Sequence, residues 1–332
     1  MRLPAAFLLA AALIVGCGGT SSVHEPDLVL SGATPSPPAP NERESSGEIR
    51  IWVVTHGQAS SKFWTIVRHG IDAGGREAKV QVTYRSPDIF SVQTMARLID
   101  EAVAAHPDGL VVSIPDDALA PAIRRAIKSG IPVVSINSGS DLSRRLGALA
   151  HVGQPEERAG YEAGKRLVAA GAKNALCVNQ EPGNEGLDRR CAGFARALRE
   201  VGGVSRVLAV DDKNLTATRH TLVEQAGKGG IDAMLLLNNS VAEVAATSVP
   251  RRVVLGTFDF SPGVLAAVRT GRLEFAVDQQ PYLQGFLPIV LLAERARYGL
   301  FPAQGEVIPT GPSFITAKNA AEVERLSSLG IR

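Results

Sequence analysis

Amide and carboxylate side chains gather at seven places in the chain, each directly after a short run of apolar residues. They lie at 55–58, 113–117, 136–138, 179–181, 211–212, 238–239 and 258–259. Such groups form hydrogen bonds without attacking a covalent bond, which suits the recognition of hydroxyl groups. If the apolar runs are parallel strands, their carboxyl ends carry these segments to the side where open sheets bind ligands. The sequence therefore predicts a binding site for a hydroxyl-rich molecule.

Motifs for catalysis and for phosphate or metal binding are missing. The sequence has no glycine-rich phosphate loop, no Gly-x-Ser-x-Gly and no His-Glu-x-x-His. No two of the six histidines are spaced as metal ligands; His56 and His151 follow strand-like runs and could contact a ligand or be structural. Asp116 and Asp117 begin a predicted helix, so capping explains them better than acid–base work. We expect no enzyme, no cofactor and no metal ion.

Strands and helices alternate around these segments, as the spacing of apolar residues indicates. In the first half we expect strands over 49–54, 80–84, 109–112 and 132–136, and helices over 63–78, 92–105 and 118–129. In the second half we expect strands over 174–178, 206–210, 233–237, 252–256 and 274–277, and helices over 156–170, 187–201, 216–227 and 262–270, with a short helix before 252. The alternation predicts parallel sheets covered by helices, and its repetition predicts an α/β protein of two doubly wound, Rossmann-like lobes.

The first 47 residues are expected to lie outside the lobes. Residues 1–17 have a basic start and an apolar run ending in Gly16-Cys17, which is typical of a lipoprotein signal peptide cut before a lipidated cysteine. A plain secretory signal is the alternative. Residues 18–47 are rich in proline and serine and predict a flexible, extended linker. The protein should therefore lie outside the cytoplasm, on the periplasmic side or outer face of the cell membrane, anchored by lipid at Cys17.

Two cysteines remain once Cys17 is assigned to lipid. Cys177 ends an apolar run and Cys191 lies in the next predicted helix. In an oxidising compartment a disulfide between them is favoured over two buried thiols, although the sequence leaves both open. The charge balance, 35 basic against 33 acidic residues, indicates no nucleic-acid partner.

The order of the polar segments, from about residue 48 to the end, resembles the type I periplasmic binding proteins for ribose, galactose and related sugars. The resemblance is carried by segments 61–64, 107–115, 130–137, 152–164, 256–259 and 278–281. It implies two lobes joined by a hinge, with the ligand between them. The implied ligand-binding residues are Phe63, Trp64, Asn137, Asp188, Asn238, Asp259 and Gln279.

Within this set, Phe63 and Trp64 would stack on the C–H faces of a sugar, with ordinary helix packing as the alternative. The sequence departs from the family at two positions. Asn137-Ser138 stands where the family has Asp-Arg, and Asp188 aligns with a second arginine, unless Arg189 or Arg190 supplies that cation. A carboxylate only accepts hydrogen bonds, so the departures favour a neutral sugar or sugar alcohol over an anion. Asp188 could instead cap its helix.

The resemblance also implies the organisation and partners of the protein. Residues 48–152 with 280–309 would form the N-terminal lobe, and 153–279 with 310–332 the C-terminal lobe. The lobes would close on the ligand and dock, as a monomer, on an ABC transporter permease. The alternative function is a sensor or quorum-type binder that presents its ligand to a membrane receptor.

Overall fold

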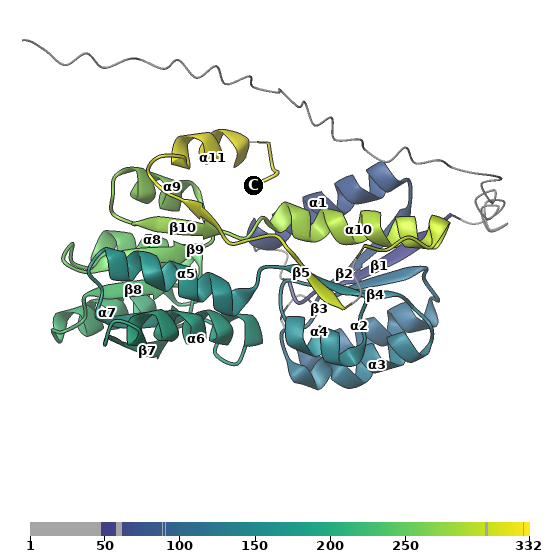
Figure 1. Cartoon of the computed structure of the whole chain (residues 1–332), viewed down its shortest axis with the longest axis horizontal. Coiled ribbons are helices and arrows are strands. Elements are labelled where there is room, and N and C mark those ends of the chain that lie inside the picture. The colour runs from purple at the N-terminus through teal and green to yellow at the C-terminus, as the bar shows by residue number, and fades with distance from the viewer. Residues whose placement is uncertain (1–47, 58–61, 88, 90, 303–304, 328) are drawn as a thin grey trace, which may run out of the picture. The chain divides into compact units, whose positions relative to one another are not determined.

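The computed structural model describes residues 48–57, 62–87, 89, 91–302, 305–327 and 329–332. The predicted signal peptide, linker and lipidated Cys17 lie outside these residues. The described chain forms two α/β lobes, each built on one six-stranded sheet (Figure 1). The predicted fold class is therefore confirmed.

The sheet of the first lobe has the strand order β11-β5-β4-β3-β1-β2, and all neighbouring strands are parallel. Its strands are β1 (Arg50–Val54), β2 (Gln81–Arg85), β3 (Gly109–Ser113), β4 (Val133–Ile136), β5 (Ala150–Gly153) and β11 (Glu306–Pro309). Helices α1 (Lys62–Ala78) and α10 (Pro281–Tyr298) cover one face, and α2 (Val92–Ala104), α3 (Ala120–Lys128) and α4 (Ser140–Leu146) cover the other (Figure 1). Because strand side chains alternate, Ile51 and Val53 join the core under α1 and α10, whereas Val54 joins the core under α2 and α3.

The second lobe repeats this arrangement. Its sheet has the order β12-β10-β9-β8-β6-β7, with only β12 antiparallel to its neighbour. Its strands are β6 (Asn174–Asn179), β7 (Val204–Ala209), β8 (Ala233–Leu236), β9 (Val254–Phe258), β10 (Phe275–Asp278) and β12 (Ser313–Ile315). Helices α5 (Glu156–Ala169) and α6 (Glu185–Arg199) pack on one core, and α7 (Leu215–Gly227), α8 (Asn239–Ser248), α9 (Pro262–Arg269) and α11 (Ala320–Ser327) on the other.

The helices and strands predicted from periodicity are all present, with ends within two residues of those expected. The sequence pattern does not predict the elements α4, β5, α10, β11, β12 and α11. β12 spans three residues, too few for a period to be read from it, and the sequence of β5, Ala-His-Val-Gly, has no apolar run typical of a buried strand. α10 buries residues around much of its circumference and contains Pro288, which obscures its helical pattern.

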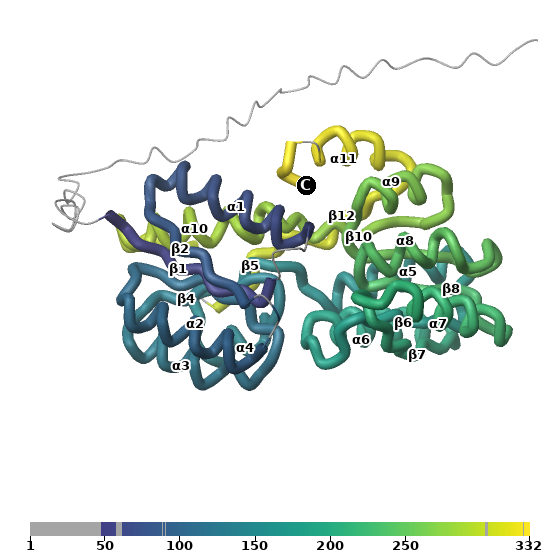
Figure 2. The backbone as a smooth tube through the Cα atoms, turned by 180° about the vertical axis from the view of Figure 1, so that it is seen from behind, coloured from purple at the N-terminus to yellow at the C-terminus, as the bar shows by residue number. Residues whose placement is uncertain are grey.

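The two lobes are joined by three crossings of the chain, and the tube view of Figure 2 shows the lobes side by side. The crossings follow β5, β10 and β11.

Within each lobe one pair of helices packs backbone against backbone through glycine. A Cβ at Gly160 would lie 2.0 Å from the Arg190 carbonyl oxygen, and one at Gly70 would lie 2.0 Å from that of Tyr282. In the part of the chain that the structure describes, no helix has the length and apolar character needed to cross a membrane.

Candidate functional site

A cavity of about 840 Å³ lies between the lobes, where the carboxyl ends of the strands meet. Six of the seven predicted ligand-binding residues line it: Phe63, Trp64, Asn137, Asn238, Asp259 and Gln279. The first three belong to the first lobe, and the last three follow β8, β9 and β10 of the second lobe. The doubly wound topology therefore brings together residues that lie more than 200 positions apart in the sequence.

Three side chains of the second lobe form a hydrogen-bonded chain along one wall. The Asp259 Oδ1 accepts a hydrogen bond from Gln279 Nε2 at 2.6 Å, and the Gln279 Oε1 accepts one from Arg190 Nη2 at 3.3 Å. Arg190 and Gln279 are 3% and 2% exposed, so each geometry is held by packing as well as by its partners. The wall presents a carboxylate, an amide and a guanidinium in fixed order, which can meet both donors and acceptors on a ligand.

Arg190 is the cation that the sequence located only as an alternative. Its Nε and Nη2 donate to the two carboxylate oxygens of Glu156 at 2.6 and 2.9 Å, and its guanidinium lies 4.3 Å from the centre of the Phe258 ring. The close approach of α5 to α6 at Gly160 makes this pairing possible. Burial lowers the pKa of Arg190, but the carboxylates of Glu156, Asp259 and Glu181 together outweigh that effect and hold the pKa above its usual value. The charge is therefore kept inside the wall.

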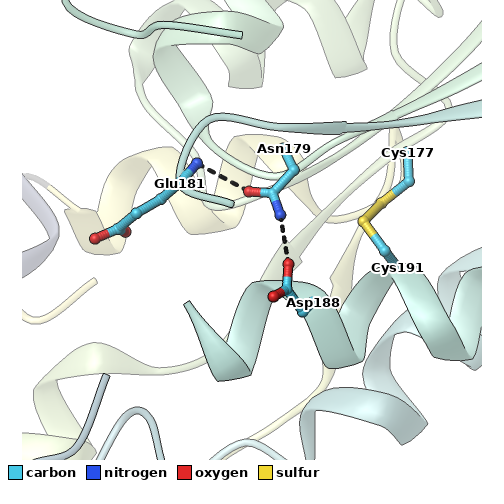
Figure 3. Close-up of a disulfide and its surroundings, with 5 residues drawn as sticks. All are labelled: Cys177, Asn179, Glu181, Asp188 and Cys191. Carbon is cyan, nitrogen blue, oxygen red and sulfur yellow. Dashed lines mark hydrogen bonds between the residues drawn. A yellow bond between two sulfur atoms is a disulfide. The ribbon is translucent and has the colours of Figure 1, made fainter. Parts of the chain in front are cut away.

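The structure does not bring Asp188 to the cavity, contrary to the expectation. Its Oδ1 accepts a hydrogen bond from Asn179 Nδ2 at 2.9 Å (Figure 3). Its Oδ2 accepts one from the Gly183 amide at 3.1 Å. Residues two positions apart on a helix point in directions that differ by about 200° around its axis. Asp188 therefore faces away from the cavity when Arg190 faces it. The carboxylate instead orders the loop after β6, whose Glu181 amide donates to Asn179 Oδ1.

One sequence signal could have distinguished these two residues. The buried stripe of α6 runs through Leu187, Arg190, Cys191 and Phe194, at the 3, 4 and 7 spacing of a core-facing helix. A cation on that stripe is buried and must have a buried partner. Asp188 is not among the buried residues of α6, so its position predicts a side chain that points away from the core.

Asn137 and Asp259 occupy equivalent places in the two sheets, directly after β4 and β9. Both have positive φ angles, 64° and 60°, which residues other than glycine rarely adopt. Asn137 is buried; its Nδ2 donates to Gln284 Oε1 at 3.5 Å, and its Oδ1 accepts from Ser138 Oγ at 3.0 Å. Such conformations persist where surrounding contacts fix them, and they gather at functional sites. The backbone thus turns both side chains toward the cavity.

Asn238 combines two structural contacts with its place in the cavity. It is the N-cap of α8, where its Oδ1 accepts from the Val241 amide at 2.9 Å, and its Nδ2 donates to Asp212 Oδ2 at 2.9 Å. Capping and ligand contact are therefore compatible here, since an amide oxygen has two lone pairs.

An aromatic wall faces these polar groups from the first lobe. The rings of Phe63 and Trp64 meet edge to face with centroids 5.2 Å apart, and His56 meets Trp64 in the same way at 4.8 Å. Trp64 is 8% exposed and also belongs to the core of the lobe, whereas Phe63 is half-buried. A Cβ at Gly57 would lie 2.3 Å from the indole ring, so only glycine leaves room for it.

The two histidines singled out from the sequence have different surroundings. His56 lines the cavity, and its Nδ1 lies 2.7 Å from Ser113 Oγ. Burial lowers the pKa of His56 to about 3, so the ring is neutral at physiological pH. His151 is buried, does not line the cavity, and places Nδ1 2.7 Å from Ser135 Oγ. Burial lowers the pKa of His151 to about 4.

The cavity is rich in negative charge. Among the described residues, six carboxylates line it, those of Glu181, Asp211, Asp212, Glu243, Asp259 and Asp278, against the three cations Lys62, Arg190 and Lys213. Burial raises the pKa of Asp259 to about 6, although Arg190 and Gln279 oppose the shift. Burial also raises the pKa of Glu181. A cleft of this sign repels anionic ligands.

The structure contains a disulfide between Cys177 and Cys191, with Cα atoms 5.6 Å apart (Figure 3). It joins β6 to the buried stripe of α6 and lies one residue from Arg190. Within the described residues, no three His, Cys, Asp or Glu side chains are placed to hold a metal ion.

Comparisons with known proteins agree with this geometry. A family model described as a periplasmic binding protein domain matches residues 51–299. A xylose/arabinose-binding protein of Sulfolobus acidocaldarius is 24% identical over 285 residues, which are 78% of this chain and 69% of that protein. A ribose import binding protein of Haemophilus influenzae is 24% identical over 236 residues, covering 69% and 79%.

Among solved structures, a carbohydrate transporter from Acidothermus cellulolyticus 11B in complex with myo-inositol superposes with a TM-score of 0.80. It is 34% identical and covers 86% of this chain and 100% of its own. The chain belongs to the family of periplasmic binding protein domains, and it is a binding protein rather than an enzyme.

Proposed function

We propose that this protein binds a neutral sugar or sugar alcohol in the cavity between its lobes and delivers it to an ABC importer. The observation that carries the proposal is the pairing of an aromatic wall, Phe63 and Trp64, with the hydrogen-bonded chain of Arg190, Gln279 and Asp259. A polyol has apolar C–H faces between hydroxyl groups that both donate and accept. Stacking on one side and mixed donors and acceptors on the other meet both needs.

The charges of the site narrow the class of ligand. Because six carboxylates of the described chain line the cavity, a phosphorylated or carboxylated sugar would be repelled. On the side of the first lobe, Asn137 and Ser138 are neutral, so neither compensates a negative ligand. The myo-inositol complex of the 34% identical Acidothermus transporter supports a cyclitol as the first compound to test.

Closure of the lobes is the proposed mechanism of capture. Residues 48–152 with 280–309 would move as one body against 153–279 with 310–332, bending at the three crossings. Asn137 and Asp259 would then reach the same ligand from opposite sides. In the dry, closed site each hydroxyl that lacks a partner would cost about 1–3 kcal/mol, which separates closely related polyols.

The proposal includes the location of the protein. Cys17 would carry lipid after cleavage of the signal peptide before it, and residues 18–47 would give the binding lobes reach from the membrane. A permease would receive the closed form.

A thermal-shift screen tests the ligand class directly. The panel contains myo-inositol, D-ribose, D-xylose, L-arabinose and D-galactose, with D-glucuronate and myo-inositol phosphate as anionic controls. A ligand at one hundred times its dissociation constant stabilises the native state by about 2.7 kcal/mol, which is easily measured. We expect a shift with at least one neutral compound and none with the anions. A shift only with the anions would refute the neutral ligand class, and no shift with any compound would refute a sugar or polyol ligand.

A further inference from the structure

The chain after α11 returns toward the first lobe. Figures 1 and 2 both show the end of the described chain between α11, on the second lobe, and α1, on the first. There the His69 Nδ1 of α1 donates to the Gly330 carbonyl oxygen at 3.0 Å. Gly330 has a φ of 70°, and a Cβ there would lie 3.0 Å from the imidazole, so glycine permits this contact. Residues 329–332 therefore connect the lobes at a place outside the three crossings.

Arg332, two residues later, reaches the bend between β10 and α10. Its Nε lies 3.1 Å from Asp278 Oδ2, and the Asp278 side chain is 0% exposed, while that of Arg332 is 27% exposed. The other oxygen, Asp278 Oδ1, accepts a hydrogen bond from the Gln280 amide at 2.7 Å. Gln280 has a positive φ of 53°, so this contact helps to hold an unfavourable backbone conformation.

The bend matters because Gln279 lies inside it. Asp278 and Gln280 flank Gln279, whose side chain links Arg190 to Asp259 in the cavity wall. Its carbonyl oxygen accepts from Gln284 Nε2 at 3.0 Å and from Thr310 Oγ1 at 2.8 Å. A shift of the Asp278 carboxylate would move the backbone that sets the direction of the Gln279 amide.

We propose that Arg332 is a positioning residue for the binding site, because it compensates the buried Asp278 carboxylate that fixes the bend around Gln279. A buried carboxylate without its cation draws in water or takes up a proton, and either change weakens its hold on the Gln280 amide. Arg332 acts on the site through Asp278. The anchoring of Gly330 to His69 places it there, so the arrangement also ties α1 of the first lobe to the hinge.

The experiment is a double-mutant cycle on the full chain, and its affinity arm rests on the proposed function. Arg332→Ala, Arg332→Lys, Asp278→Asn and the double variant Asp278→Asn/Arg332→Ala are titrated calorimetrically with myo-inositol. The asparagine in Asp278→Asn keeps an oxygen that accepts from the Gln280 amide but needs no cation. We expect Arg332→Ala to weaken affinity about tenfold and Arg332→Lys to recover most of it, because residues in direct contact commonly have coupling energies on that scale. In the Asp278→Asn background, Arg332→Ala should change nothing further.

A ligand-free measurement separates this inference from the proposed function. Amide hydrogen exchange of the segment 278–284 should quicken in Arg332→Ala and be equal in Asp278→Asn with or without Arg332. The matched control is Arg269→Ala, which breaks an exposed pair with Glu324 on α11 and should leave both exchange and affinity unchanged. If wild-type protein binds no myo-inositol, exchange alone decides the inference. Unchanged exchange in Arg332→Ala, or an effect that persists in the Asp278→Asn background, would overturn it.

Discussion

Replacing Asp259 with asparagine should weaken ligand binding and strengthen the fold at the same time. Asparagine has the same shape, tolerates the φ of 60° at this position, and keeps an oxygen that accepts from Gln279 Nε2. The substitution therefore removes the charge and little else. Its two effects have opposite signs, which distinguishes a binding residue from one that only supports the structure.

The loss of affinity follows from the strength of hydrogen bonds to a charged group. Such bonds contribute about 1.5–3 kcal/mol, so Asp259→Asn should raise the dissociation constant roughly ten- to a hundredfold. Calorimetric titration with the ligand identified by screening measures this change.

The gain in stability follows from the raised pKa. In the folded protein burial raises the pKa of Asp259 from an ordinary value of 3.8 to about 6, so the ionised form opposes folding. This penalty is absent below pH 3.8, grows as the pH rises to 6 and is complete above it. At 1.36 kcal/mol per pH unit it amounts to at most about 3 kcal/mol, an upper figure because the carboxyl is only half-buried. Urea unfolding at pH 7.5 should find Asp259→Asn more stable than wild type.

The same pKa predicts how affinity depends on pH. Hydroxyl donors on the ligand favour the ionised carboxylate, so affinity should fall as the pH falls through 6. Between pH 7 and pH 5 the ionised fraction drops about tenfold, and the dissociation constant should rise by the same factor. His56, with a pKa of about 3, stays neutral throughout. Glu181 and Asp278 also have raised pKa values, so Glu181→Gln and Asp278→Asn are measured beside Asp259→Asn.

Two results would refute this reasoning. One is wild-type affinity in Asp259→Asn at pH 7.5, which would mean that the carboxylate does not meet the ligand. The other is a pH dependence that survives in Asp259→Asn but disappears in Glu181→Gln or Asp278→Asn. The matched control is Asp100→Asn, which removes an exposed carboxylate paired with Arg125 on the outer side of the first lobe and should alter neither affinity nor pH profile.

Three further predictions concern other parts of the chain. Phe63→Leu should weaken ligand affinity several-fold with little change in melting temperature, since stacking contributes about 0.5–1.5 kcal/mol. Trp64→Ala should lower both the affinity and the melting temperature, because the Trp64 ring also belongs to the core. Unchanged affinity in both variants would exclude the aromatic wall from the site. The Cys177–Cys191 disulfide joins residues 14 positions apart, and its reduction should lower the unfolding free energy by up to about 3 kcal/mol. Identical urea unfolding curves with and without reductant would contradict this. Cys17→Ser should abolish partitioning of the full-length protein into the detergent phase, and unaltered partitioning would argue against the lipid anchor.

Much of the fold could be predicted because its strands are buried and its helices amphipathic. The run Leu110-Val111-Val112 has few alternatives to a buried parallel strand, since both of its faces are covered. What escaped prediction depends on contacts distant in sequence. β11 pairs with β5 although some 150 residues separate them, and its own four residues carry no pattern. Such strands form because they can pair with the edge of a sheet built from distant residues, and the sequence of the strand itself does not indicate that pairing.

The site divides in the same way. Asn238, Asp259 and Gln279 follow strands that periodicity predicts, so their side of the sheet could be inferred. Arg190 lies on a helix, where a shift of two residues reverses the direction of a side chain, and alignment to a family does not fix that phase. Its buried partner Glu156 lies in another helix, 34 positions earlier. Only the packing of α5 on α6 at Gly160 unites them.

Exchanging Asn137 for aspartate tests whether the first lobe must remain neutral. Aspartate adopts the left-handed conformation of this residue, so the backbone is preserved. The Nδ2 that donates to Gln284 Oε1 becomes an oxygen, however, and two acceptors then face each other at 3.5 Å. Gln284 cannot turn its amide to compensate, because its Nε2 donates to the Gln279 carbonyl and to Thr310 Oγ1.

Asn137→Asp should therefore lower the unfolding free energy by about 1–3 kcal/mol at pH 7.5 and recover part of it at pH 5, where the new carboxyl takes up a proton. Affinity for a neutral polyol should fall with it, because Gln279 is held through Gln284. Urea unfolding at both pH values and titration with myo-inositol measure these effects. Wild-type stability and affinity at pH 7.5 would mean that water already reaches Asn137. The neutral residue at this position would then not be a condition of the site, and the case for a neutral ligand would rest on the carboxylates of the second lobe alone.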